Sequence, residues 1–211
     1  MKKVLLILAA ALLLGTQAFG QISPKLGYTL GIDLAQSKVN VNNNGMLIQH
    51  GFYAGAEYKI DLPWVKGLVA LPGAYINAMF GSGNEDLLNY PRGKYTDISI
   101  YVPAFAGYYH KFNRKVAIMG YGGPALSLGL IKKCTRDFGG GATSSQDFYA
   151  NDYTMTHNRA MLLLGIGVGV DLFGKLRITS GSDFGLTPFF NNNQARISRS
   201  AQLRFSVGYL F

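Results

Sequence analysis

The sequence has little of what stabilises a small soluble domain outside the cytoplasm. Its 211 residues contain one cysteine, Cys134, which excludes an intramolecular disulfide. Charged residues make up 15% of the chain, against about 25% in a typical soluble domain. Beyond residue 20 there is no run of 18 apolar residues, which excludes a transmembrane helix. The seven prolines are spread out, so neither a linker nor a second domain is indicated.

The first twenty residues have the features of a secretory signal peptide. A basic start, Met1-Lys2-Lys3, precedes an apolar run of eleven residues, and small residues follow at Ala18 and Gly20. A membrane anchor is the alternative, but eleven residues fall short of the roughly 20 that a spanning helix needs. We therefore expect cleavage after Gly20, with residues 21–211 forming one domain.

The charge balance is basic but dispersed. The formal net charge is +9, of which Lys2 and Lys3 belong to the leader, and no basic cluster in the mature chain exceeds the adjacent pair Lys132-Lys133. An exported chain of this kind meets no nucleic acid, so a nucleic-acid partner is excluded. The charge instead favours attraction to anionic lipopolysaccharide and outer-membrane phospholipids.

Strict alternation of apolar and polar residues is the main structural signal. In "AQLRFSVGYLF" (201–211) every second residue from Ala201 to Phe211 is apolar or aromatic, while Gln202, Arg204 and Ser206 fall on the other face. This period is that of a β-strand with one apolar face. The same alternation occurs in residues 25–34, 51–60, 97–109 and 159–172, and less regularly, with glycine, proline or serine interrupting it, in residues 68–80, 116–130 and 176–186.

The connections between these eight strands alternate in length. Short ones are expected at residues 61–66, 110–115 and 173–175, and long polar ones at residues 36–49, 81–95, 132–158 and 187–198. Short turns at one rim and long loops at the other are typical of outer-membrane barrels. We predict an all-β, eight-stranded antiparallel up-and-down transmembrane β-barrel in the outer membrane, with both termini in the periplasm. A soluble β-sandwich is the alternative, but here the apolar face carries the largest residues.

The polar face of such a barrel lines a lumen that is just wide enough for side chains to fill. Buried charges in so narrow a space are expected to pair, because an unpaired one costs several kcal/mol. Tyr53, Tyr101 and Tyr109 are expected beside them. The predicted lumen network holds the basic residues Lys25, Lys59, Arg159, Arg177 and Arg204 and the acidic residues Asp33, Glu57, Asp97, Asp171 and Asp183.

The sequence shows no convincing catalytic or metal-binding arrangement. His50, His110 and His157 lack metal-ligand spacing to one another or to Cys134. A hydrolase built on His157 and the neighbouring Asp147 is conceivable, but polar loops are more often simply solvated. We therefore expect no metal, no cofactor and no enzymatic activity.

Two resemblances follow from these segments. Phe205, Tyr209 and Phe211 resemble the C-terminal signal that the barrel-assembly machinery reads on outer-membrane proteins. "DISIYVPAFAGYY" (97–109), "VAIMGYGGPALSLGL" (116–130) and "GVGVDLFGKLRITSGSDFGLTPF" (167–189) resemble strands of PorT-type outer-membrane β-barrel proteins of Bacteroidota-like Gram-negative bacteria, with Pro103 and Gly123-Pro124 at the matching points. That resemblance implies the barrel fold and, for PorT itself, a link to type IX secretion; it supplies no catalytic residue.

The function predicted from the sequence is a structural or interaction role through four long extracellular loops, with the lumen plugged by paired charges. OmpX-like proteins of the same eight-strand architecture suggest surface adhesion, by analogy alone. The alternatives are a narrow channel or a secretion-associated transport component, and then a lipid-modifying outer-membrane enzyme. A secretion-system component or a surface ligand is the partner that these functions imply.

Overall fold

The computed structural model describes residues 20–38, 45–83, 93–137, 143–150, 157–188, 190–191 and 195–211. The leader predicted for residues 1–20 lies outside this range except for Gly20, so its cleavage stays a prediction. Among the described residues there is no helix long and apolar enough to cross a membrane. The strands within these residues are β1 (Gly20–Ser37), β2 (Gly45–Asp61), β3 (Leu68–Gly83), β4 (Gly93–Lys111), β5 (Val116–Asp137), β6 (Thr143–Asp147), β7 (Ala160–Leu172), β8 (Leu176–Gly185), β9 (Phe190–Asn191) and β10 (Ala195–Tyr209).

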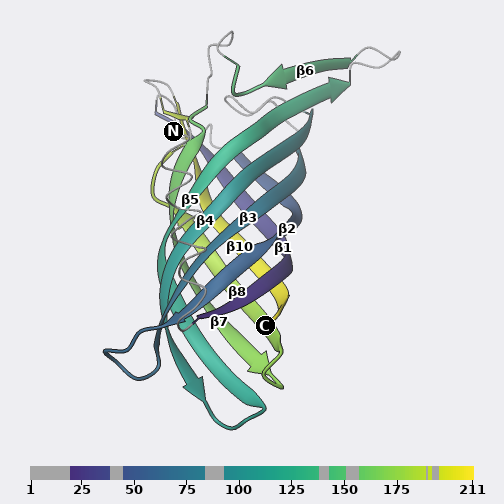
Figure 1. Ribbon diagram of the computed structural model, residues 1–211. Helices are drawn as coiled ribbons and strands as arrows, with labels where there is room; N and C mark the ends of the chain where they lie inside the picture. The colour runs from purple at the N-terminus through teal and green to yellow at the C-terminus, as the bar shows by residue number, and fades with distance from the viewer. Residues whose placement is uncertain are drawn as a thin grey trace, which may run out of the picture.

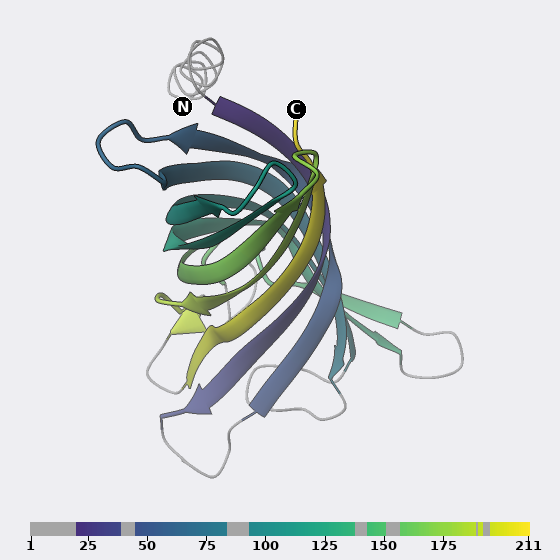
Figure 2. The same cartoon turned by 90° about the horizontal axis from the view of Figure 1, so that it is seen from below.

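The eight long strands of the described chain form one closed antiparallel sheet (Figures 1 and 2). Each pairs with the next along the chain, and β1 also pairs with β10, for example Tyr28 with Phe205. Closure leaves the ring without a free edge. The predicted eight-stranded up-and-down barrel is therefore confirmed. The two short strands, β6 and β9, pair with β5 and β10.

The outer wall of the barrel is apolar and its interior is polar. Leu26, Phe52 and Ile166 on the outer face expose 65%, 63% and 56% of their surface, whereas Thr29 on the inner face exposes none. The alternation predicted for β1, β2, β4, β7 and the second half of β10 places the same residues on these two faces. Large apolar side chains thus cover the surface that a water-soluble protein would make polar.

The two ends of the barrel differ. The turn end carries residues 62–67, 112–115 and 173–175, close to the three short connections predicted, together with the start of β1 and the end of β10. The loop end carries the connections after β1, β3, β5 and β8, which lie largely outside the described residues. There the strands run further than the sequence predicted, because β5 reaches Asp137 and β10 begins at Ala195. Lys132 and Cys134, predicted to lie in a loop, are therefore strand residues.

Two β-bulges lie near the loop end. Opposite the step from Ile32 to Asp33, the register skips Ser200 of β10. Opposite the step from Ile98 to Ser99, it skips Leu130 of β5. An extra residue in one strand reverses which side chains point inward beyond it. In β10 the inward residues are even-numbered from Gln202 onward but odd-numbered before the bulge.

Candidate functional site in the barrel lumen

Buried charges nearest the turn end form the first cluster in the lumen. Arg177 donates from Nε and Nη2 to the two carboxylate oxygens of Asp171, at 2.6 and 2.7 Å. Its Nη1 donates to Glu57 Oε1 at 3.0 Å, and Lys25 Nζ lies 2.8 Å from the same oxygen. Arg177 and Asp171 are also direct neighbours across β7 and β8. These two cations and two carboxylates, the turn-end cluster, thus compensate one another in the lumen.

An aromatic layer with one ion pair occupies the middle of the lumen. Arg204 Nη2 donates to Asp183 Oδ1 at 2.7 Å, and the Tyr101 hydroxyl donates to the same oxygen at 3.1 Å. The Arg204 guanidinium lies 3.9 Å from the centre of the Tyr101 ring, a cation–π arrangement. Gly165 allows this packing, because a Cβ there would overlap the Asp183 carboxylate and the Phe105 ring.

A second charge cluster crosses the lumen nearer the loop end. Arg199 faces Asp33 across β10 and β1, and Lys132 faces Asp97 across β5 and β4. Arg199 Nε donates to Asp33 Oδ1 at 2.7 Å, and its Nη2 donates to Asp97 Oδ2 at 3.2 Å. Lys132 Nζ lies 3.4 Å from Asp33 Oδ2 and 3.6 Å from Asp97 Oδ2. These four residues, the loop-end cluster, join two pairs of strands on opposite sides of the ring.

An aromatic cap covers this cluster toward the loop end. Phe148 stacks on Tyr95 with ring centres 6.1 Å apart and on His157 with ring centres 4.7 Å apart. The His157 ring in turn lies 5.7 Å from that of Phe190. Burial of His157, with a smaller contribution from the charge of Lys132, holds the pKa of its imidazole well below the ordinary value. Tyr95, Phe148, His157 and Phe190, the aromatic cap, are therefore uncharged at neutral pH.

Nine of the ten predicted lumen residues are buried in the structure. The exception is Arg159, which precedes β7, is exposed, and lies with its guanidinium 4.9 Å from the Tyr149 ring centre. Arg159 lines a small pocket that Asp97 and Arg199 also line, so its side chain lies toward the lumen without being buried. Lys59 is buried at the rim, 3.5 Å from the exposed carboxylate of Asp61 and 4.0 Å from the Tyr109 ring centre.

Sequence reasoning missed Lys132 and Arg199, the two cations of the loop-end cluster. Extending the alternation of β10 backward from Gln202 places Ser200 inside and Arg199 outside. The bulges at Ser200 and Leu130 reverse this order and turn both cations inward. The sequence shows that Lys132 and Arg199 are charged residues close to the ends of regularly alternating segments. It does not show that a bulge separates them from those segments.

The buried charges of the described lumen are held in ion pairs. Among the described residues there is no group of three or more histidine, cysteine or acidic residues that could hold a metal. A small pocket beside Asp97, Ser127 and Arg199 has a volume of about 20 Å³, room for about one water molecule. Cys134 is a buried free thiol. The arrangement is suited to closing the barrel and fixing its shape.

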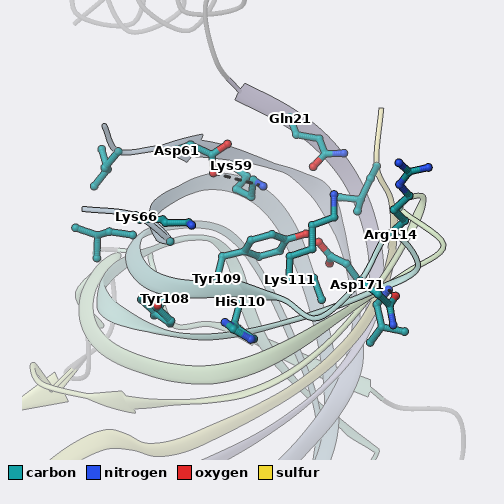
Figure 3. Close-up of a pocket in the computed structure, with 18 of the residues that line it drawn as sticks. Gln21, Lys59, Asp61, Lys66, Tyr108, Tyr109, His110, Lys111, Arg114 and Asp171 are labelled. Atoms are coloured by element: carbon teal, nitrogen blue, oxygen red, sulfur yellow. Dashed lines mark hydrogen bonds and ion pairs between the residues drawn. The ribbon is translucent and has the colours of Figure 1, made fainter. Parts of the chain in front are cut away.

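The turn end, in contrast, opens into a large pocket (Figure 3). Its volume is about 910 Å³, and Lys59, Asp61 and Tyr109 lie in its wall. Asp171 of the turn-end cluster also reaches its lining, so the pocket ends against the first layer of ion pairs. The other charged residues that line it are Lys66, Lys111, Arg114 and Lys115.

The predicted C-terminal signal residues lie on the outer wall. Phe205, Tyr209 and Phe211 expose 52%, 44% and 76% of their surface, and the rings of Tyr209 and Phe211 lie 4.8 Å apart. Their placement on one face agrees with the alternation read from the sequence. Their reading by the assembly machinery stays a prediction.

Comparison with known proteins yields likeness to solved structures alone. No family model matches the chain, and no curated protein matches it. The Ail attachment invasion locus protein of Yersinia pestis, solved with the heparin analogue sucrose octasulfate, is 14% identical, with 92% of this chain and all of that chain covered and a TM-score of 0.43. Neisserial surface protein A is 15% identical, with 91% and 97% covered and a TM-score of 0.41. An outer membrane channel from Pseudomonas putida F1 is 9% identical, with 92% and 96% covered and a TM-score of 0.35.

Proposed function

We propose that the protein is an integral outer-membrane β-barrel with a closed lumen and a structural or interaction role, and that it is not an enzyme. The observation that carries this proposal is its inside-out pattern, with exposed apolar side chains around the wall and paired charges within. Only a closed barrel satisfies every backbone hydrogen bond of strands placed in hydrocarbon. Export through the predicted signal peptide is consistent with this location.

The filled lumen supports a plug rather than a channel. Eleven charged residues of the described interior are buried, six basic and five acidic. All of them are paired with one another except Lys59, whose partner is the exposed Asp61. The aromatic cap lies over the loop-end cluster. A conducting path through the loop-end cluster would separate buried opposite charges, at a cost of several kcal/mol. We therefore expect no steady ion conductance.

A projecting ribbon supports the interaction role. At the loop end, β5 pairs with β6 through residues 133–137 and 143–147 (Figure 1). The last two residues of β5, 136–137, extend past its pairing with β4, which ends at Thr135. Lys133, Thr135 and Thr143 on it are exposed. An exposed strand edge can accept another chain by strand addition. The resemblance to PorT-type barrels makes a secretion-associated protein the first partner to test.

The proposed orientation follows from the unequal ends. Short turns face the periplasm in bacterial barrels, so the turn end and both termini are assigned to the periplasm and the β5–β6 ribbon to the cell surface. Lipopolysaccharide would then surround the upper part of the wall. The exposed Phe205, Tyr209 and Phe211 would be available to the barrel-assembly machinery during insertion.

The architecture is tested by electrophoresis of the outer-membrane fraction with and without boiling. A closed barrel stays folded in cold detergent and migrates apart from the boiled chain. Single-channel recording of the same folded material tests the plug, and silence is expected. Identical migration in both lanes would contradict the proposed membrane barrel. Steady conductance would contradict the closed lumen and favour the channel.

The interaction role is tested by shortening the ribbon. Replacing residues 134–146 by a short glycine-serine turn removes the projecting ends of β5 and β6 and also Cys134 of the interior. A second variant, Lys133→Ser with Thr135→Gly, disturbs the exposed side chains alone. Both should retain the cold-to-boiled shift and lose partners cross-linked at the cell surface. Unchanged cross-linking with both variants would contradict a ribbon-based contact.

A further inference from the structure

Each short turn at the turn end exposes one large aromatic side chain, among the residues that the structure describes. Trp64, Phe112 and Phe173 expose 81%, 60% and 70% of their surface. Phe173 has a φ of 56°, a left-handed conformation that is uncommon for a bulky residue. Single exposed aromatic residues are ordinary, but three on one rim form a set that favours burial against a partner.

Exposed basic residues stand beside these aromatic side chains. Lys66 follows Trp64 on one turn, and Arg114 and Lys115 follow Phe112 on the next. All three basic residues are exposed and line the pocket of about 910 Å³ (Figure 3). Of the two carboxylates in the pocket lining, Asp171 is held by Arg177 within the lumen. The pocket is therefore electropositive.

The pocket also borders the apolar outer wall. Tyr108 lines the pocket and exposes 56% of its surface. The turn of residues 62–67 stands away from the wall (Figure 2), held at its base by the Tyr109 amide, which donates to the Gly67 carbonyl at 2.7 Å. A ligand in this position would meet cations on one side and aromatic and apolar side chains on the other. That combination fits an anionic amphiphile.

We propose that the turn end binds anionic phospholipid of the facing leaflet, with the headgroups at the pocket that Lys66 lines on one side and Arg114 and Lys115 line on the other (Figure 3). This inference rests on the proposed membrane location. Trp64 and Phe112 lie at the depth of the headgroups, where aromatic side chains are enriched. Each basic residue near an anionic surface strengthens binding about fivefold at low salt. The site thus fixes the depth of the barrel in the leaflet.

Trp64 offers a direct measurement, because it is the single tryptophan of the chain. The folded full chain in neutral detergent is titrated with phosphatidylglycerol brominated in its acyl chains, which quenches nearby tryptophan. Saturable quenching is expected, with brominated phosphatidylcholine at least about tenfold weaker. Added salt should weaken the first titration and leave the second unchanged.

Matched variants assign the effect to this site. Lys66→Gln/Arg114→Gln/Lys115→Gln should raise the half-saturating phosphatidylglycerol concentration at least about tenfold. The control Lys94→Gln/Lys133→Gln/Arg196→Gln removes two lysines and one arginine that are exposed toward the loop end, and it should stay within about twofold.

Two results would overturn the inference. These are equal quenching by the two lipids, or equal effects of the two triple variants. In each case a retained cold-to-boiled shift would leave the proposed barrel standing. Absence of that shift in the unmodified chain would instead contradict the proposed membrane barrel, and with it the lipid site.

Discussion

The loop end and the turn end of the lumen hold charges of the same kinds in different surroundings. At the loop end, Asp33, Asp97, Lys132 and Arg199 meet across the barrel beneath the aromatic cap. At the turn end, the innermost ion pairs face a pocket of about 910 Å³. Among the described residues, the loop-end charges thus lie beneath aromatic side chains, whereas the turn-end charges border an open pocket. Energetic consequences of a substitution should therefore depend on the end at which it is made.

The largest effect is expected from Arg199→Met at the loop end. The change leaves Asp33 and Asp97 buried with Lys132 as their remaining cation within the cluster, which should destabilise the fold by about 3–5 kcal/mol. The measurement is the urea midpoint of the folded band on cold gels. Arg199→Met/Asp33→Asn restores charge balance and should recover part of the loss. An unchanged midpoint for the single variant would contradict the cluster.

The next effect is expected from opening the cap. Phe148→Ala removes the ring between Tyr95 and His157 and should cost about 3 kcal/mol, as for other buried aromatic truncations. The matched change at the turn end, Phe112→Ala, concerns an exposed ring and should stay within about 0.5 kcal/mol. Urea midpoints of the two variants give the comparison. Equal losses would mean that the two ends are not packed differently.

A pH dependence should distinguish the ends without mutation. The pKa of His157 is lowered by burial, so protonation favours the open cap over the closed one. The stabilisation is complete above the unfolded pKa of about 6.5 and is lost as the pH falls below it. The protection of residues 143–150 against hydrogen exchange, measured relative to the intrinsic exchange rate at each pH, should therefore be lower at pH 5 than at pH 8.

The variant His157→Phe keeps a ring in the cap and removes its titration. It should abolish the pH dependence of the protection of residues 143–150 against exchange, while leaving the protection of the turn-end residues as it was. If the protection still changed with pH in this variant, a group other than His157 would be responsible. Lys132 and Asp33, the charges that act on His157, would be the first to test.

The smallest effect is expected at the turn-end rim. Lys59→Met breaks a contact with Asp61 that spans 3.5 Å and whose acidic partner is 63% exposed. Ion pairs of this kind contribute less than about 1 kcal/mol. Lys132→Met at the loop end should cost several times more, because its carboxylate partners are buried. Similar urea midpoints for the two variants would contradict the expectation that ion pairs contribute more to stability at the loop end than at the turn end.

Much of the barrel could be read from the residues alone. The apolar face of β10, from Leu203 to Tyr209, and the lumenal Lys25, Glu57 and Asp183 were placed correctly. They could be read because alternation with a period of two is a local property of an extended chain. The exposure of Arg159 could not be read from the sequence, because the alternation itself does not mark where a strand ends. The less regular strand β3 was found despite Pro72, because its length and the alternating lengths of the connections on either side are those of an up-and-down barrel.

The local pattern determined which segments are strands and, in the regularly alternating ones, which face is apolar. The closed ring decided how the charges pair, because a bulge exists only in relation to the neighbouring strand. Ser200 is skipped opposite a step at Ile32 and Asp33, far away in the sequence. That one-residue slip turns Arg199 inward, and the slip at Leu130 does the same for Lys132. The cluster that closes the loop end is thus a product of register, which non-local pairing alone determines.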